Sequence, residues 1–463
     1  MTIPTTHVEA IRVGLALVSR PCRSRRKLMR SGPYNLNILC TLSVLSLVYI
    51  LPSIASGDES KTLKREMDPV VVAGDHCKDC IGQSMVNYGL YALRNGRLDP
   101  IPFQIDELDG KGQYVLTNGK GKAEDSDKGL FDSNDQLVFM ALDTGDRLVK
   151  HELVPQDARG CIEIAVADPV TGDKGWVYLM TFPGPVARSA IDYVRYEPED
   201  LRITARNYVA QFDKRFPAAA EKYAFRETIG GDGTDIIDRV KIRTYIKFVV
   251  GLHRTEEDIL VSEIGYIDGP VRVIVRARNT INLFLGIPAM KTVGNALYYY
   301  SYADFPLIID TPVRPTEFRV QVYDEFMNLA GWTMYSSTNP KGHPIDGVMD
   351  DRDKDVDLSP WKWSAISNGR LTFWSLALYP PACPVNASLY YNDDIAARNL
   401  PEGVPGEVPG LGWDVSEGWD KVERFPFEMR LLHFFTEGYA PGDEKAVVNI
   451  HDYPLVEEVK KIK

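Results

Sequence analysis

The chain has 463 residues, of which 44% are hydrophobic and 25% are charged, and its formal net charge is −11. This is the composition of an ordinary folded protein, and it excludes a disordered chain, a collagen-like repeat and a polytopic membrane protein. Because phosphate binding needs a basic face, the negative charge also argues against a nucleic-acid partner.

The first 55 residues have the order of segments found in a secretory signal. A basic stretch around Arg25 precedes an uncharged apolar run from Leu36 to Leu51, and small residues follow around Ala55. This is the order of n-region, h-region and cleavage site. The apolar run has sixteen residues, fewer than the roughly 20 that span a bilayer. We therefore expect cleavage near Ala55 and a periplasmic or extracellular protein with no integral membrane span.

An arginine pair in the leader leaves the export route and the start codon open. Arg25 and Arg26 follow Ser24 and precede Lys27, which is similar to a twin-arginine export signal. If translation begins at Met29 rather than Met1, the pair lies upstream of the protein. A short basic n-region then remains.

Four cysteines remain once the leader is removed, namely Cys77, Cys80, Cys161 and Cys383. The compartment outside the cytoplasm is oxidising, so disulfides are favoured over metal ligands. Of the three possible connectivities, the local one joins Cys77 to Cys80 and Cys161 to Cys383. Covalent haem is excluded, because Ile81 stands where a histidine must follow the second cysteine.

Strand-like runs begin after residues 56–67, a polar segment that we interpret as a flexible tether. Short runs rich in Val, Ile, Tyr and Phe then alternate with turn clusters, as in antiparallel sheets. These runs are Val70–Ala73, Val86–Leu93, Pro100–Ile105, Gln136–Leu142, Cys161–Ala167 and Gly175–Phe182. The segment Pro183-Gly184-Pro185 breaks any strand. We therefore expect an N-terminal β unit over residues 68–185.

Residues 186–463 are expected to form a second, C-terminal β-sandwich unit, entered through a charged crossing segment. Ile259–Ile267 and Val271–Asn279 flank the turn Asp268-Gly269-Pro270 and predict a long hairpin. Ile236–Val250 fits a helix about as well as a strand, and its β-branched residues favour a strand. Later runs are Asn295–Tyr302, Phe318–Tyr323, Leu371–Tyr379, Ala387–Tyr391 and Phe427–Phe435.

The order of these runs predicts the fold class. No fixed-period repeat and no strand–helix alternation occurs, which disfavours a propeller, a solenoid and a parallel sheet. We predict a mainly β protein of antiparallel β-sandwich architecture, either two linked sandwiches or one large super-sandwich. Glycine-rich nucleotide turns, nucleophile elbows and zinc-protease motifs are missing from the sequence. No nucleotide cofactor is therefore expected, and whether the protein is an enzyme stays open.

Two acidic loops predict calcium binding, because alternate carboxylates converge on a hard cation that takes six to eight oxygens. The first loop departs from the EF-hand pattern at Val356, where glycine is needed, and at Lys362, where the bidentate glutamate would fall. The alternative is a solvated loop in which Arg352 and Lys354 neutralise their neighbours. The carboxylates concerned are Asp351, Asp353, Asp355 and Asp357 in the first loop, and Asp125, Asp127 and Asp132 in the second.

Basic and aromatic residues predict a carbohydrate surface. Strand alternation places Arg272, Arg276 and Arg278 on one sheet face, where guanidiniums bind the carboxylates of an acidic sugar bidentately. Alternatively, these arginines pair with acids on neighbouring strands. Trp413 and Trp419 lie in a Gly/Pro-rich stretch and are predicted to stack on sugar rings from the surface.

A functional hypothesis combines these features. His343 stands beside Pro344 and just before the first acidic loop, and it is the candidate catalytic base. The leading hypothesis is an exported soluble protein that binds or processes an extracellular or envelope polysaccharide with the help of calcium. The alternative is a non-catalytic structural or interaction protein of the cell envelope.

Overall fold

The computed structural model describes residues 59–120, 125, 127–282, 290–310, 315–327, 329–380, 383–397, 407–422 and 426–463. These residues belong to one compact unit, Ser56–Lys463. The expected signal segment lies outside the described residues, and among those described no helix is long and apolar enough to cross a membrane.

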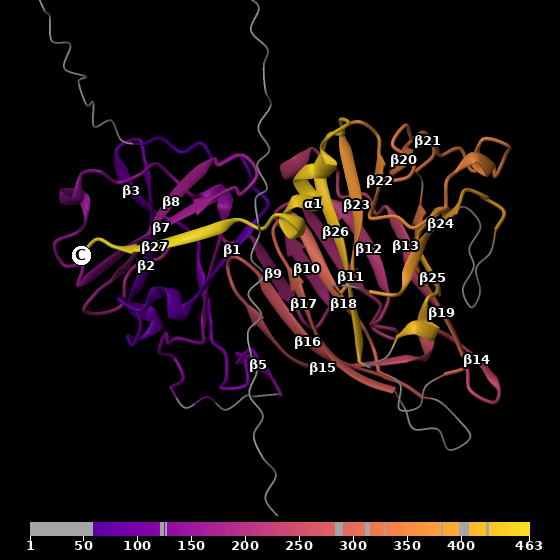
Figure 1. The fold of residues 1–463 in the computed structure, drawn as a ribbon, viewed down its shortest axis with the longest axis horizontal. Coiled ribbons are helices and arrows are strands. Elements are labelled where there is room, and N and C mark those ends of the chain that lie inside the picture. The colour runs from indigo at the N-terminus through magenta and orange to yellow at the C-terminus, as the bar shows by residue number, and fades with distance from the viewer. Residues whose placement is uncertain are drawn as a thin grey trace, which may run out of the picture. The chain divides into compact units, whose positions relative to one another are not determined.

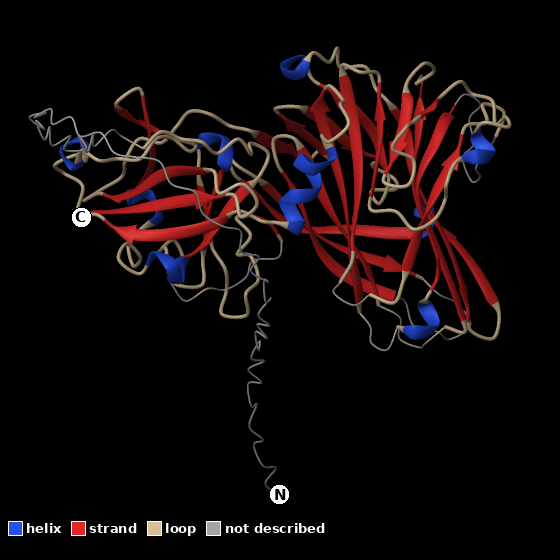
Figure 2. Ribbon diagram, turned by 45° about the horizontal axis from the view of Figure 1, so that its top comes forward, coloured by secondary structure: helices blue, strands red, loops and turns tan. Residues whose placement is uncertain are grey.

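Strands dominate the fold, as Figure 2 shows, and every strand pair is antiparallel. The described residues hold five sheets and one α-helix, α1 (Glu444–Asp452). The predicted fold class, mainly β with antiparallel sheets, is confirmed.

Two sheets lie in the N-terminal part of the chain. One has three strands in the order β1 (Pro69–Ala73), β6 (Gln136–Met140) and β4 (Gln104–Asp106). The other has five strands in the order β27 (Val456–Lys461), β7 (Gly160–Ala167), β8 (Lys174–Thr181), β2 (Tyr88–Arg94) and β3 (Arg97–Pro100). Both sheets contribute to one hydrophobic cluster, in which Val72, Phe139 and Leu179 are fully buried.

Part of the segment that we expected to be a flexible tether, residues 61–63, is packed against the N-terminal sheets. Leu63 is only 4% exposed. The backbone N–H of Lys61 donates to Asp146 Oδ1 at 2.8 Å, and that of Thr62 donates to the carbonyl of Lys174 at 2.8 Å. Apolar burial and these hydrogen bonds hold residues 61–63 in place, so the expectation of flexibility is wrong for them.

Each of the two predicted β units contributes a strand to a sheet of the other unit. β27, near the end of the chain, pairs with β7 from Val456 opposite Ala167 to Lys461 opposite Ile162, and Figure 1 shows it in yellow beside β7. In the other direction, β5 (Asn118–Gly119) pairs with β15 (Ile259–Asp268). The division near residue 185 is therefore crossed in both directions.

Three further sheets form the larger part of the protein. The ten-stranded sheet has the order β21 (His343–Pro344), β20 (Thr333–Ser336), β22 (Trp363–Ser367), β23 (Leu371–Leu378), β26 (Phe427–Glu437), β18 (Tyr302–Ile309), β17 (Met290–Tyr298), β16 (Val273–Ile281), β15 and β5. The five-stranded sheet has the order β14 (Gly251–Thr255), β13 (Ile237–Lys247), β19 (Glu317–Met327), β25 (Glu407–Glu417) and β24 (Asn386–Asn392). The four-stranded sheet has the order β12 (Ala220–Phe225), β11 (Tyr208–Phe212), β10 (Arg202–Ala205) and β9 (Val194–Glu197).

Aromatic side chains join these three sheets in one core. Phe326 of the five-stranded sheet contacts Phe373 of the ten-stranded sheet, with ring centroids 5.3 Å apart. Tyr223 of the four-stranded sheet packs on Phe435 of the ten-stranded sheet at 5.6 Å. Because side chains of facing sheets interdigitate, this part of the protein is layered as a sandwich.

Two local predictions in this part are confirmed, and a third is an exception. The hairpin around Asp268-Gly269-Pro270 is β15 paired with β16, and the ambiguous segment from Ile236 is the strand β13. The exception is the supposed crossing segment after Pro185, which contains all four strands of the four-stranded sheet. The strand pattern of this segment is hard to recognise because charged residues alternate with the apolar ones: exposed Arg195 lies between buried Val194 and Tyr196.

Candidate functional site

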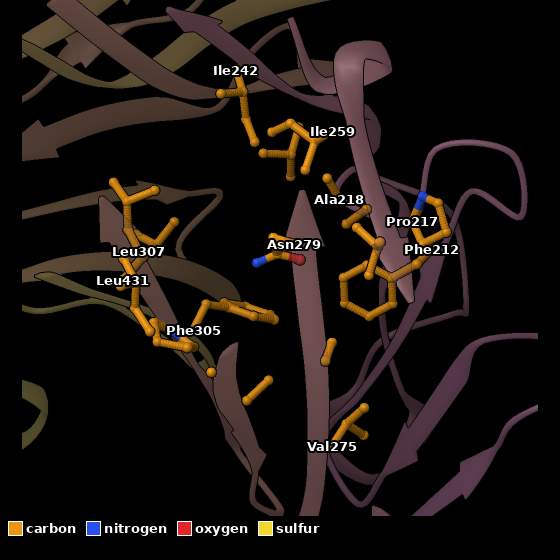
Figure 3. Close-up of a pocket in the computed structure, with 18 of the residues that line it drawn as sticks. Phe212, Pro217, Ala218, Ile242, Ile259, Val275, Asn279, Phe305, Leu307 and Leu431 are labelled. Atoms are coloured by element: carbon orange, nitrogen blue, oxygen red, sulfur yellow. The ribbon is translucent and has the colours of Figure 1, made fainter. Parts of the chain in front are cut away.

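An apolar cavity of about 370 Å³ lies between the ten-stranded sheet and the five-stranded sheet that contains β13, β19 and β25. Its walls come from β15, β16, β17, β18 and β26 on one side, and from β13, β19 and β25 on the other. Phe212 of β11 and the segment Pro217–Ala218 close a third side, as Figure 3 shows.

Strand alternation makes the cavity wall apolar. Val275, Ala277 and Ile281 of β16 face it, together with alternate residues of β17 from Met290 to Tyr298. The wall continues through Phe305, Leu307, Leu431 and Ile242, which Figure 3 labels around the same space. A cavity with this lining favours an apolar occupant, because little along its walls replaces the hydrogen bonds that a polar molecule makes with water.

A buried polar cluster adjoins the apolar wall. His433 and Tyr223 both line the cavity, and His433 Nδ1 lies 3.1 Å from the Tyr223 hydroxyl oxygen. His433 Nε2 lies 3.5 Å from Asp324 Oδ2. Burial lowers the pKa of His433 to about 3 and raises the pKa of Asp324 well above its ordinary value. Both directions favour the uncharged forms of the two side chains, which keeps two charges out of the core.

Trp413 supplies a hydrogen-bond donor without a partner. Its side chain lines the cavity and is 1% exposed, and its Nε1 atom is buried with no hydrogen-bond partner among the described residues. Buried donors in native proteins are nearly always satisfied. An orphaned indole N–H in a cavity wall is therefore a position where a bound molecule can supply the acceptor.

The described wall of the cavity contains few acidic side chains. Among the described lining residues Glu263 is the one carboxylate, and it accepts a hydrogen bond of 2.6 Å from the Tyr196 hydroxyl. Glycoside hydrolysis ordinarily uses two carboxyl groups across the scissile bond. Among its described residues, the cavity wall provides one such group, the carboxylate of Glu263.

Arg272, predicted to bind a ligand, is buried and committed to the protein. It is 2% exposed, and its guanidinium lies 2.7 Å from Asp106 Oδ2. Arg276 is also buried and donates to Asn295 Oδ1 at 2.9 Å, whereas Arg278 is exposed. The alternative that we considered, pairing within the fold, holds for Arg272. The three arginines do not form a surface that holds a ligand.

The other predicted ligand residues are scattered. Trp419 is 8% exposed and packs edge-on against Phe318 at 4.6 Å, so neither it nor Trp413 stacks on a surface ligand. The predicted surface position of both tryptophans is wrong, although Trp413 does line the cavity. The candidate base His343 is on β21, at the edge of the ten-stranded sheet, and does not line the cavity.

The predicted convergence of carboxylates in the first acidic loop is not formed. Arg352 pairs with Asp350 at 2.8 Å, and Lys354 pairs with Asp351 at 2.7 Å. Asp353 turns inward and accepts a hydrogen bond from the Tyr391 hydroxyl at 3.2 Å. The ion pairs match the alternative in which the basic residues neutralise the loop. Asp355 and Asp357, the remaining predicted ligands, do not join Asp351 and Asp353 around one cation.

The second acidic loop lies partly outside the described residues, which include Asp125, Asp127 and Asp132 but not residues 121–124. Burial and a hydrogen bond with Asp127 raise the pKa of Asp132. No group of three His, Cys, Asp or Glu side chains within the described ranges is arranged to hold a metal ion.

All four cysteines of the described chain are free thiols, and neither predicted disulfide is formed. Cys161 is buried in a cluster with Trp176, whereas Cys383 packs against the core of the large sheets. Because these two side chains lie in different hydrophobic clusters, the predicted bond between them is replaced by separate apolar packing. Cys77 and Cys80 are likewise buried and unbonded.

No family model matches the chain, and no curated protein is similar to it in sequence. Its structure superposes on an alpha-mannosidase from Enterococcus faecalis V583 with a TM-score of 0.42 and 9% identity, over 88% of this chain and 44% of that chain. A protein in the glycosyl hydrolase family 38 from Enterococcus faecalis gives a TM-score of 0.43 and 7% identity, over 88% of this chain and 46% of that chain. The chain spans less than half the length of either structure.

Proposed function

We propose that the protein binds an apolar or amphipathic small molecule in the cavity between its two large sheets. The observation that carries this proposal is the lining, which is almost entirely aliphatic and aromatic around a volume of about 370 Å³. Ligand pockets in proteins are mostly apolar hollows of roughly 300–1,000 Å³ with few polar groups. The cavity has that size and that chemistry.

The polar end of the cavity indicates an amphipathic ligand. Trp413 Nε1 has a hydrogen to donate, and neutral His433 and Tyr223 lie in the same wall. A ligand with one hydroxyl or carbonyl group satisfies the indole N–H while its apolar body fills the rest. An ionised group is disfavoured there, because the same burial holds His433 neutral.

Chain length is the variable that tests the proposal. Each methylene that enters an apolar cavity contributes about 0.8 kcal/mol, so two methylenes tighten binding by roughly tenfold. We expect straight-chain primary alcohols to displace the apolar fluorophore N-phenyl-1-naphthylamine with an affinity that rises with length and then reaches a plateau when the cavity is full. Affinity that is independent of length would contradict the proposal.

Two variants show whether the fluorophore binds inside the cavity: one blocks the cavity, and the other is its matched control. Ala277→Phe places a ring in the cavity and is expected to abolish displaceable fluorophore binding. Val293→Phe adds a larger side chain on β17, where Val293 is 46% exposed and its neighbours Thr292 and Gly294 line the cavity. It is expected to bind as the natural protein does. Equal binding by both variants would place the fluorophore elsewhere, and displacement by maltotriose instead of alcohols would favour the polysaccharide hypothesis.

We also propose that the protein acts outside the cytoplasm. The support is the order of basic, apolar and small-residue segments in residues 1–55. The compartment is tested by fractionating cells and detecting the protein. Recovery only in the cytoplasmic fraction would overturn this proposal and would leave the cavity proposal unaffected.

A further inference from the structure

A second hollow, of about 560 Å³, has the opposite chemistry to the apolar cavity. It is formed by β9, β10 and the segment that follows β12, and three arginines line it: Arg195, Arg206 and Arg226. Asp192 and Glu197 are the two acids among its described lining residues. The sequence pattern did not indicate these arginines, because the strands that bring them together were not predicted.

Sheet geometry brings Arg206 and Arg226 together. Arg206 lies in the turn between β10 and β11, and Arg226 directly follows β12. The backbone N–H of Arg226 donates to the carbonyl of Asn207 at 2.9 Å, and the Thr228 hydroxyl donates to the carbonyl of Arg206. The two arginines are therefore fixed on neighbouring pieces of backbone.

The guanidiniums of both arginines contact uncharged groups of the protein, and these contacts do not cancel their positive charge. Arg226 Nη1 donates to the carbonyl of Ala205 at 2.8 Å, which leaves its other N–H groups available. The Arg206 guanidinium carbon lies 5.9 Å from the centroid of the Tyr300 ring, where the ring face attracts a cation. These contacts orient the side chains and leave their charge in place.

The acids of the hollow are already paired with other arginines. Asp192 accepts from Arg195 at 3.0 Å, and Glu197 accepts from Arg202 at 2.6 Å. No carboxylate of the described chain forms an ion pair with Arg206 or Arg226. In a protein with a net charge of −11, two guanidiniums that line one hollow without a carboxylate partner among the described residues make it a local positive site.

We propose that this hollow binds an oxyanion-bearing small molecule, with Arg206 and Arg226 as its anchors. Guanidinium groups recognise carboxylates and phosphates through paired N–H donors, and such charge-assisted hydrogen bonds are stronger than neutral ones. The volume of about 560 Å³ leaves room for a molecule larger than a single inorganic anion. The site is separate from the apolar cavity, because the two share no lining residue.

Calorimetric titration with three probes tests the proposal and identifies the source of the oxyanion. Trigalacturonate supplies carboxylates on a sugar, inorganic tripolyphosphate supplies phosphates, and maltotriose is the neutral comparison. We expect one of the two anions to bind and maltotriose not to bind. Tighter binding of trigalacturonate identifies an acidic sugar, and tighter binding of tripolyphosphate identifies a phosphate compound. If neither anion binds, the proposal is wrong.

Variants distinguish this site from general surface charge. Hydrogen bonds to charged groups contribute about 1.5–3 kcal/mol, so Arg206→Ala is expected to weaken anion binding by roughly tenfold or more. Arg226→Lys keeps the charge and the fold but loses the planar donor pair, and it is expected to weaken binding as well. Arg97→Ala removes an exposed arginine that pairs with Asp99 outside the hollow and is expected to change nothing. Equal weakening in all three variants would refute the assignment.

Discussion

The buried ion pair between Arg272 and Asp106 gives the sharpest stability prediction. The Arg272 guanidinium donates to Asp106 Oδ2 through Nε at 2.8 Å, to the Tyr299 hydroxyl at 3.1 Å and to Gln136 Oε1 at 2.8 Å. The exposed fractions of the two charged side chains are 3% and 1%. Arg272 precedes β16, whereas Asp106 ends β4, so the pair joins strands from distant parts of the chain.

Removing Arg272 leaves a buried carboxylate without its counter-ion. Breaking such a pair on one side costs about 3–5 kcal/mol of unfolding free energy. For a folded unit of roughly 400 residues, the usual unfolding entropy per residue converts this loss into a fall of about 4–6 °C in Tm. The assay is thermal unfolding of Arg272→Ala followed by circular dichroism.

Two further variants make the test specific. Arg278→Ala removes an exposed arginine from β16, the strand that begins just after Arg272, and is expected to change stability by about 0.5 kcal/mol or less. The double variant Arg272→Met with Asp106→Leu removes both charges and is expected to recover most of the loss, because well-packed apolar side chains can replace a buried pair. If Arg272→Ala melts at the same temperature as Arg278→Ala, the pair does not carry the stability that we assign to it.

Three other predictions concern pH, thiols and the leader. Burial raises the pKa of Asp393 from 3.8 to about 6, so its stabilising contribution is full below pH 3.8 and is lost as the pH rises through 6. The unfolding free energy of the wild-type protein should therefore fall relative to that of Asp393→Asn between pH 4 and 7. Parallel curves of unfolding free energy against pH for the two proteins would contradict this. Burial raises the thiol pKa to about 12 for Cys77, about 11 for Cys80 and about 12 for Cys161. Iodoacetamide at pH 8 should therefore modify half-buried Cys383 first, as measured by peptide mass spectrometry of the native protein. Recovery of a peptide with a Cys77–Cys80 disulfide would instead support the bond that the sequence predicted. The exported protein should begin near Ser56, and N-terminal sequencing that finds Leu36–Leu51 retained would refute cleavage there.

Local patterns in the sequence predict many of the strands of this fold, whereas the pairing of distant strands does not follow from them. The hairpin of β15 and β16 follows from two alternating runs around a Gly-Pro turn. The pairing of β18 with β26 joins Tyr302 to Phe434, and no local pattern indicates which distant strand is the neighbour. β11 and β12 were missed because half-buried polar residues such as Gln211 and Lys222 interrupt their apolar runs.

The candidate sites were harder to predict, because their chemistry depends on what covers each sheet face. Alternation separates Arg272 from Val273, yet both are buried, since Gln104 and Asp106 of β4 cover the arginine side. Trp413 follows Gly412, and a glycine-rich segment is easily interpreted as a loop. Here it is a strand in which a Cβ at Gly412 would lie 2.4 Å from Tyr323 Cα, so the glycine permits close backbone contact. The cavity wall itself has the same residue types as an ordinary core.

The pairing of β27 with β7 has a consequence for biosynthesis. β7 is synthesised long before β27. Until β27 is made, the backbone N–H and C=O groups along the outer edge of β7 in the five-stranded N-terminal sheet have no strand to pair with. Open strand edges of this kind recruit other chains, and contacts between distant segments form slowly. Completion of the five-stranded N-terminal sheet therefore requires a strand that is synthesised long after β7, and the edge of β7 stays open while the intervening residues are made.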